Sequence, residues 1–251
     1  MSPSLASLLV VLALLFLSMA VYAARGRRPD ADAQSKNAQF LGGLGNFVLH
    51  WFLWLVAPAA TLSIRLGLGP DFYNFAGLAF GAVAGLALAA GALEAGGWAL
   101  AVSGVCDIMD GRIARARGIT SRYGAFIDSL LDRFIELFFF VGFAFFARQT
   151  PHGAVAGTLA VGASVLVSYA RAMGESLGVE CTGGLMQRGE RLALLSLGCL
   201  VDRPLSAALA QPTGTTLLAI AYFIGVTSLL TAVHRTIWIA RRLRAPQPPA
   251  H

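Results

Sequence analysis

The chain has 251 residues, of which 57% are hydrophobic and only 13% are charged, whereas soluble domains carry about a quarter of charged residues. Such a sequence must bury much of its surface in lipid, which excludes an ordinary soluble protein. The net charge of +6 comes from basic residues scattered between apolar segments. The positive-inside rule accounts for this distribution, and the lack of a clustered basic face argues against a nucleic acid partner.

The N-terminal segment, Leu5 to Ala23, is an apolar run long enough to cross a hydrocarbon core of about 30 Å. No basic residue precedes it, whereas a secretory signal peptide would have a charged start. We therefore predict an uncleaved transmembrane anchor over residues 1–24, with the basic residues that begin at Arg25 on the cytoplasmic side. Residues 25–45 are polar and mixed in charge, which is typical of a linker.

Residues 46–67 predict an interfacial helix rather than a span, because His50, Pro58 and Arg65 interrupt the apolar run. Trp51 and Trp54 in this helix are expected at the level of the lipid headgroups. Six candidate spans follow, at about 72–92, 96–117, 122–147, 153–174, 188–202 and 215–240, and a tail covers 245–251. The expected fold is an all-α polytopic membrane protein with six core spans, an interfacial helix and an additional N-terminal anchor.

Four carboxylates lie within one of the most apolar parts of this sequence. Asp107 and Asp110 are three residues apart, and Asp128 and Asp132 are four apart, so each pair shares one face of a helix. The turn-forming residues Gly118 to Ser121 lie between the pairs. An antiparallel hairpin folded there would set Asp110 level with Asp128 and Asp107 level with Asp132, roughly 13 Å and 18 Å from the turn.

Carboxylates this close together in an apolar setting cannot all stay ionised without compensating cations. Their oxygen ligands suit a hard divalent ion, Mg²⁺ or Mn²⁺, and four of them would fit a site that holds two ions. Structural pairing with Arg112, Arg115 or Arg133 is the alternative, but it explains neither the matched depths nor the neighbouring glycines.

The same stretch resembles the signature of the CDP-alcohol phosphatidyltransferase family, Asp-x-x-Asp-Gly-x-x-Ala-Arg, eight residues, then Gly-x-x-x-Asp-x-x-x-Asp. The match has no gap or substitution and comprises Asp107, Asp110, Gly111, Ala114, Arg115, Gly124, Asp128 and Asp132. Weaker similarity extends over 46–244, which we take as the family domain. The resemblance implies an enzyme that moves a phosphatidyl group from CDP-diacylglycerol to the hydroxyl of a small polar alcohol and releases CMP.

The family pattern also implies roles for these residues. Asp107, Asp110 and Asp128 would be the core metal ligands, and Asp132 would be a ligand-adjacent general base. Gly111, Ala114, Arg115 and Gly124 would line the cytidine diphosphate pocket. Upstream, Asp71 and Asn74 occupy the place of a family segment that contacts nucleotide, although capping of the helix that starts near residue 72 is the alternative.

The acceptor is expected near three arginines, Arg171 at the end of the fourth span and Arg188 and Arg191 at the start of the fifth. Arginines at a helix N-terminus form a ready phosphate site, although the positive-inside rule alone could place them there. Their surroundings resemble those of the phosphatidylinositol phosphate synthase-like subgroup, which favours inositol phosphate as the acceptor. Glycerol phosphate or another alcohol stays open.

Topology follows from the charges. With the turn at 118–121 in the cytoplasm, Arg148 and Arg203 are the two basic residues left outside, as the positive-inside rule requires. The active site would then face the cytoplasm from the cell (inner) membrane, and the resemblance implies a homodimer. Two other classes remain open, an intramembrane prenyltransferase and a cation- or proton-coupled transporter.

Overall fold

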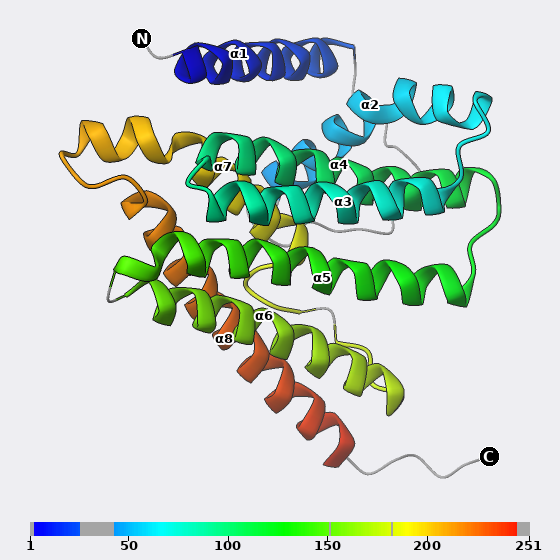
Figure 1. Ribbon diagram of the computed structural model, residues 1–251. Helices are drawn as coiled ribbons and strands as arrows, with labels where there is room; N and C mark the ends of the chain where they lie inside the picture. The colour runs from blue at the N-terminus through cyan, green and yellow to red at the C-terminus, as the bar shows by residue number, and fades with distance from the viewer. Residues whose placement is uncertain (1–2, 26–42, 151, 182, 245–251) are drawn as a thin grey trace, which may run out of the picture.

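The computed structural model describes residues 3–25, 43–150, 152–181 and 183–244, and it is built of helices (Figure 1). The α-helices are α1 (Pro3–Ala24), α2 (Gly43–Arg65), α3 (Pro70–Ala89), α4 (Leu93–Ala116), α5 (Arg122–Phe146), α6 (Gly153–Ser176), α7 (Arg188–Ala208) and α8 (Thr215–Arg244), with a short 3₁₀ helix at Ala147–Gln149. The predicted all-α fold is confirmed. Most of the predicted linker and the whole predicted tail lie outside the described residues.

Within the described ranges, three helices are long and apolar enough to cross a membrane, namely α3, α6 and α8, and Leu12–Ala24 of α1 is a shorter apolar stretch. The helices α4, α5 and α7 occupy the places of the other expected spans. They carry the acidic and basic residues on which the functional prediction rests, and these charges lower their hydropathy. The number of six core spans therefore stays a prediction.

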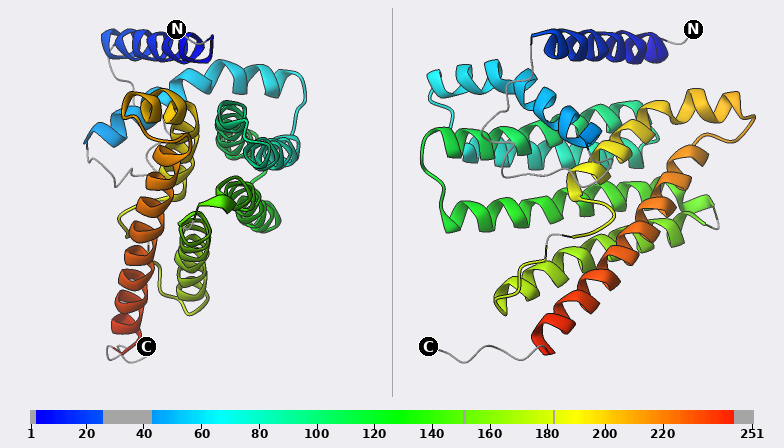
Figure 2. Two further views of the ribbon diagram at one scale, coloured as in Figure 1. Left: turned by 60° about the vertical axis from the view of Figure 1, so that its left-hand side comes forward. Right: turned by 180° about the vertical axis from the view of Figure 1, so that it is seen from behind.

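Helix α2 packs one of its tryptophans against α1. It runs across the direction of α3 and α4, which the left panel of Figure 2 views nearly end-on, and this is the orientation expected of an interfacial helix. Trp51, however, is only 5% exposed, and its indole N–H donates to the Ser18 hydroxyl of α1 over 3.0 Å. The side chain is therefore packed against α1, and its level at the lipid headgroups stays a prediction.

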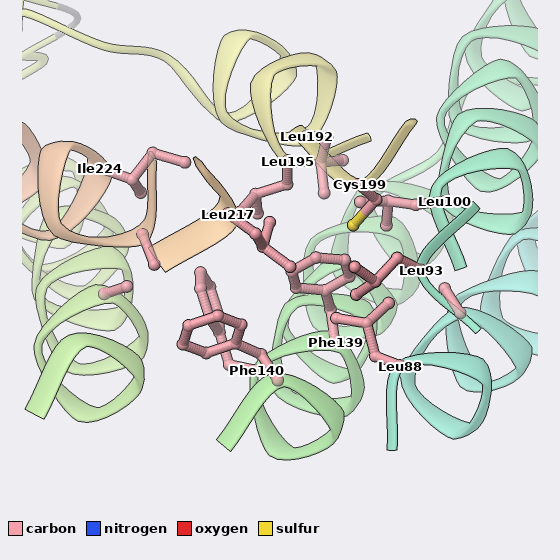
Figure 3. Close-up of a cluster of buried hydrophobic side chains, with 14 of the residues drawn as sticks. Leu88, Leu93, Leu100, Phe139, Phe140, Leu192, Leu195, Cys199, Leu217 and Ile224 are labelled. Atoms are coloured by element: carbon pink, nitrogen blue, oxygen red, sulfur yellow. The ribbon is translucent and has the colours of Figure 1, made fainter. Parts of the chain in front are cut away.

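Helix α3 packs along both α4 and α5, whereas α4 and α5 make few direct backbone contacts with each other (Figure 1). The sequence correctly places an antiparallel turn between them, at Gly118 with φ +65°. The expected antiparallel hairpin is therefore present, but its two helices pack through α3 rather than directly on each other. The main hydrophobic cluster, which includes Leu88, Leu100 and Phe139, closes the other end of this arrangement (Figure 3).

Small residues let the helix backbones approach closely. A side chain at Gly85 of α3 would overlap the Phe138 carbonyl of α5, and one at Gly142 of α5 would overlap the Gly85 carbonyl. The Ser103 hydroxyl of α4 donates to the Gly77 carbonyl of α3 over 2.8 Å. Close glycine contacts combined with interhelical hydrogen bonds are the usual means of helix association in lipid, where apolar side chains gain little by leaving the bilayer.

The end of α7 extends beyond the expected span, which stops at about residue 202. The helix continues to Ala208 with Pro204 inside it, and Asp202 is fully buried. The Asp202 carboxylate accepts hydrogen bonds from the Gly214 and Leu217 amides, over 2.6 Å and 2.9 Å. It therefore satisfies amides at the start of α8, a role for which an acidic side chain is well suited.

The α3–α5 contact predicts a specific loss of stability. Gly142→Ala should lower the free energy of unfolding by about 1–3 kcal/mol, because the new methyl group has to displace the α3 backbone. Gly162→Ala is the matched control, since a side chain there meets nothing within 4 Å. Thermal unfolding of the purified variants in detergent measures the difference. An unchanged midpoint for Gly142→Ala would contradict the close backbone contact.

Candidate active site

A pocket between α3, α4 and α5 contains the four motif aspartates. Its lining comprises Tyr73, Asn74 and Gly77 from α3, Ser103, Asp107 and Asp110 from α4, and Asp128, Leu131, Asp132 and Ile135 from α5. The helices α4 and α5 each contribute two aspartates to the lining, and α3 contributes three further residues. The sequence-predicted aspartates therefore converge on one site.

Three of the carboxylates lie close enough together to hold a metal ion. One oxygen from each of Asp107, Asp110 and Asp128 lies within 4.8 Å of the others, with Asp110 buried and the other two half-buried. Three hard oxygen donors from two helices fit a divalent ion such as Mg²⁺ or Mn²⁺. Asp132 stands beside this group in the same pocket.

Arg188 links the two deeper aspartates. One guanidinium nitrogen donates to the Asp107 carboxylate over 2.9 Å, and the other terminal nitrogen lies 2.5 Å from a carboxylate oxygen of Asp132. Asp107 and Asp132 are the pair that the hairpin argument placed at equal depth, and a single cation from α7 bridges them.

The start of α7 is built to present this arginine. Gln187 is the N-cap residue of α7. Its backbone N–H donates to the Glu190 carboxylate over 2.7 Å, as one half of a reciprocal capping box. This arrangement satisfies amides that a helix start leaves without partners. Because Arg188 follows the cap directly, the cap fixes where its side chain leaves the helix.

Arg191 lies one turn further along α7 and is almost fully buried in an ion pair with Glu136 of α5. Its Nε and Nη2 atoms donate to one Glu136 oxygen over 3.3 Å and 2.8 Å. Arg133 donates to the other oxygen of Glu136 over 3.2 Å. Glu136 is one helical turn beyond Asp132, so the acidic face of α5 continues past the motif and holds the second arginine beside the pocket.

The predicted nucleotide residues lie at the ends of α4 and α5 that are joined by the turn. A side chain at Gly111 would come within 3.1 Å of the Arg115 guanidinium, so the glycine leaves room for that arginine to lie across the helix. Ala114 is half-buried. The Gly124 amide donates to Ser121, which caps α5, over 3.0 Å. Their role in nucleotide binding stays a prediction.

Asp71 and Asn74 separate in the structure. Asn74 is buried and lines the aspartate pocket from α3. Asp71 is exposed in the first turn of α3 and does not line the pocket. The cap of α3 is Gly69, with no side-chain cap hydrogen bond, so the geometry favours Asn74 over Asp71 as a ligand contact.

Arg171 stands apart from the other two predicted acceptor arginines. Its side chain is 53% exposed near the end of α6 and pairs with Glu175, one turn further along the same helix, over 2.7 Å. Surface pairs of this kind contribute little to stability. The structure thus brings Arg188 to the aspartates and Arg191 close to them, and leaves Arg171 at the surface.

Some residues at the site lie outside the aspartate motif, so the motif could not have identified them. Tyr73 and Ser103 line the pocket, and Glu136 pairs with Arg191. Glu136 could have been found by extending the four-residue spacing of Asp128 and Asp132 by one more turn. Tyr73 and Ser103 depend on how α3 and α4 pack, which spacing alone does not specify.

A bundle of apolar helices with four carboxylates around one pocket is the arrangement expected of a membrane protein that binds a divalent metal. Comparison with known proteins identifies which one: residues 70–241 match the model of the CDP-alcohol phosphatidyltransferase family. The chain belongs to this family and is therefore an integral membrane transferase. This assignment replaces the prenyltransferase and transporter alternatives.

Relatives with related names cover most of the chain. Archaetidylinositol phosphate synthase of Methanothermobacter thermautotrophicus is 32% identical over 72% of this chain and 87% of its own length. Phosphatidylinositol phosphate synthase of Mycobacteroides abscessus is also 32% identical, over 72% of this chain and 84% of its own length.

Solved structures of Mycobacterium tuberculosis phosphatidylinositol phosphate synthase share the fold. The one with CDP-DAG bound has a TM-score of 0.65 at 28% identity and covers 77% of this chain and 98% of its own. The one in complex with manganese and citrate has a TM-score of 0.66 at 27% identity, covering 78% and 93%.

The cluster of three carboxylates predicts how substitution of its aspartates changes metal affinity. Asp107→Asn and Asp128→Asn should each weaken Mn²⁺ binding by more than the roughly 10–100-fold that follows loss of an outer-shell partner, because each removes a ligand charge. Turnover with saturating Mn²⁺ should fall below about a tenth of wild type, since a divalent metal contributes several kcal/mol to such reactions. Isothermal titration with Mn²⁺ and CMP release measure the two effects.

Asp71→Asn is the matched control for this titration, because it removes an exposed carboxylate outside the pocket. Its Mn²⁺ affinity should equal that of the wild type. Wild-type affinity in both Asp107→Asn and Asp128→Asn would rule out these residues as ligands.

Proposed function

We propose that this protein transfers the phosphatidyl group of CDP-diacylglycerol to a hydroxyl of inositol phosphate and releases CMP, in phospholipid biosynthesis. The family assignment supports the reaction class. The names of the relatives support the acceptor, and the CDP-DAG in a related structure supports the donor.

The observation that carries the proposal is the position of Arg188 between Asp107 and Asp132. A cationic side chain suited to an acceptor phosphate is placed against the predicted general base and next to the three predicted metal ligands. Donor diphosphate, acceptor phosphate and the base can therefore meet within one pocket.

The aspartates divide the chemistry between them. Asp107, Asp110 and Asp128 would hold the metal, with two ions as the expected number. When bound, a divalent metal supplies screening of the donor diphosphate and stabilises charge on the departing CMP. Asp132 accepts the proton of the acceptor hydroxyl while that oxygen bonds to the phosphorus of the phosphatidyl group, and the bond from this phosphorus to the CMP oxygen breaks.

The acceptor phosphate would lie against Arg188 and Arg191. Guanidinium groups bind phosphate with charge-assisted hydrogen bonds, and a helix N-terminus adds favourable backbone dipoles. Glu136 holds Arg191 in place over 2.8 Å. The same basic groups would also accept glycerol phosphate, which remains the alternative acceptor.

The location follows from the charges. We place the Arg117–Ser121 turn on the cytoplasmic side of the cell membrane. With an even number of core spans, the basic end of α8, which carries Arg241, Arg242 and Arg244, would lie on the same side. Soluble inositol phosphate would then reach the pocket from the cytoplasm, and the donor would enter from the lipid.

A homodimer is the expected assembly. Phe134, Leu137, Val141 and Phe145 are large apolar side chains of α5 that are each more than 40% exposed. They recur at spacings of three and four residues, so they share one face. Lipid would cover this face in a monomer, and analytical ultracentrifugation in detergent distinguishes the two states.

Removing the base should separate binding from chemistry. Asp132→Asn should lower kcat by about 10²–10⁴-fold, as loss of a general base does, while CDP-diacylglycerol affinity stays close to wild type. Single-turnover CMP release and donor binding are measured on the same preparation. An equal loss of kcat and of donor affinity would indicate that Asp132 acts mainly as a metal ligand rather than as a general base.

The arginines predict a selective effect on the acceptor. Arg188→Ala and Arg191→Ala should raise the acceptor KM by roughly 10- to 150-fold, because each charge-assisted contact is worth about 1.5–3 kcal/mol. The CDP-diacylglycerol KM should stay nearly unchanged. Arg171→Ala is the comparison, because this exposed arginine lies at the surface end of α6; an equally large effect there would return it to the acceptor site.

The identity of the acceptor is tested with the wild-type enzyme. Turnover is compared with inositol phosphate, glycerol phosphate and free inositol at equal concentrations, with CDP-diacylglycerol and Mn²⁺ present. Faster turnover with glycerol phosphate or free inositol would overturn the acceptor assignment and leave the family assignment intact.

A further inference from the structure

We propose that the N-terminal helix α1 fastens α2 against the motif-bearing part of α4, and so positions the donor side of the active site. Helix α1 lies outside the residues that match the family model. It lies on the outside of the bundle, next to α2, in Figures 1 and 2. The inference rests on the proposed donor, CDP-diacylglycerol, and is independent of which alcohol is the acceptor.

The contact between α1 and α2 is local and specific. Ser18 donates its hydroxyl proton to the Leu15 carbonyl over 2.7 Å and accepts the Trp51 indole N–H over 3.0 Å. Tyr22 packs its ring against Phe47 and Trp54, with centroid distances of 5.7 Å and 5.6 Å. An indole N–H buried within an apolar region needs such a partner, so this hydrogen bond fixes how α1 meets α2.

Exposure separates this contact from the rest of α1. Tyr22 is 5% exposed, whereas Phe16 and Leu17 are 68% and 62% exposed. A simple anchor would show lipid-facing side chains all round. Here one face of the last turns is covered by α2, and the remainder is left to lipid.

Helix α2 in turn supports the motif of α4. Val56 and Ala60 of α2 form a buried cluster with Met109 and Ile113 of α4. In the sequence, Met109 comes directly before Asp110 and Gly111, and Ile113 comes directly before Ala114. The same turns of α4 therefore have α2 on one side and the aspartate pocket on the other.

Two arginines of α4 strengthen the support. Arg112 donates to the Leu53 carbonyl over 2.8 Å, and Arg117 donates to the Ile64 carbonyl over 3.1 Å. Both acceptors are main-chain atoms of α2. Pro58 has no N–H to donate to the Trp54 carbonyl, so the helical hydrogen-bond pattern of α2 is interrupted next to Leu53.

A further hydrogen bond joins α2 to the pocket lining. The Ser63 hydroxyl of α2 lies 2.5 Å from the Tyr73 hydroxyl, and Tyr73 lines the aspartate pocket. Displacement of α2 would thus reach the pocket through α3 as well as through α4. Both routes end at the side where the nucleotide is expected.

The acceptor side takes its support from elsewhere. Arg188 pairs with Asp107 and Asp132, and Arg191 pairs with Glu136. None of these partners belongs to α1 or α2. Asp107 lies on α4, but it precedes the Met109 and Ile113 contacts with α2, and the other partners lie on α5. Loosening α1 should therefore raise the donor KM more than the acceptor KM, a separation that general loss of folded protein would not produce.

The test uses the full chain in detergent micelles with the acceptor that the wild-type enzyme turns over fastest. The double variant Ser18→Ala with Tyr22→Ala should raise the CDP-diacylglycerol KM by about 3- to 10-fold, because the one hydrogen bond and the two aromatic contacts that join α1 to α2 are lost. The acceptor KM should stay within about twofold of wild type. Phe16→Ala is the matched control, since it truncates an exposed side chain of the same helix, and its two KM values should not change.

Trp51→Phe provides a milder variant that keeps a ring and removes the N–H donor, and it should move the donor KM in the same direction by a smaller factor. Hydrogen exchange of the α2 amides should be faster in both variants than in the control. For the double variant, a donor KM within twofold of wild type, or an equal rise of the donor and acceptor KM values, would overturn the proposal. Failure of the acceptor assignment would appear separately, as preference of the wild type for another alcohol.

Discussion

The cost of burying carboxylates in an apolar helix bundle is the constraint on which this structure depends. An unpaired charge in such a setting is strongly unfavourable, so every acidic group there needs cations or hydrogen-bond donors. Asp107 and Asp132 share Arg188, Glu136 binds Arg191 and Arg133, and Asp202 accepts amides of α8. The arginine pairs bring the start of α7 over the pocket, and Asp202 joins the other end of α7 to α8.

The packing of α3 follows from the same constraint. If α4 and α5 packed directly, their aspartates would be forced together with no room for a ligand. Helix α3 contacts both helices through glycines, and Gly85 lets it come within backbone distance of α5. The close contact at the apolar end and the gap at the aspartate end are two consequences of where glycines and aspartates lie along these helices.

Features that depend on local spacing could be predicted from the sequence. The aspartate pairs, the turn at Gly118 and the helical nature of the chain all follow from periodicity and turn residues, and the matched pair Asp107 and Asp132 does meet at one cation. The burial of Trp51 and the continuation of α7 through Pro204 could not be predicted in this way. Both depend on a distant partner, Ser18 in one case and the start of α8 in the other, and tertiary contacts of this kind override local signals.

Arg188 connects the electrostatics of the fold with those of the reaction. Its guanidinium compensates two carboxylates, yet it stands where an acceptor phosphate is expected. A phosphate that approached Arg188 would compete with Asp107 and Asp132 for the same donors, and a metal held by Asp107 would offset that competition by supplying positive charge. Metal and acceptor phosphate would then support each other's binding, because each supplies the charge that the other displaces.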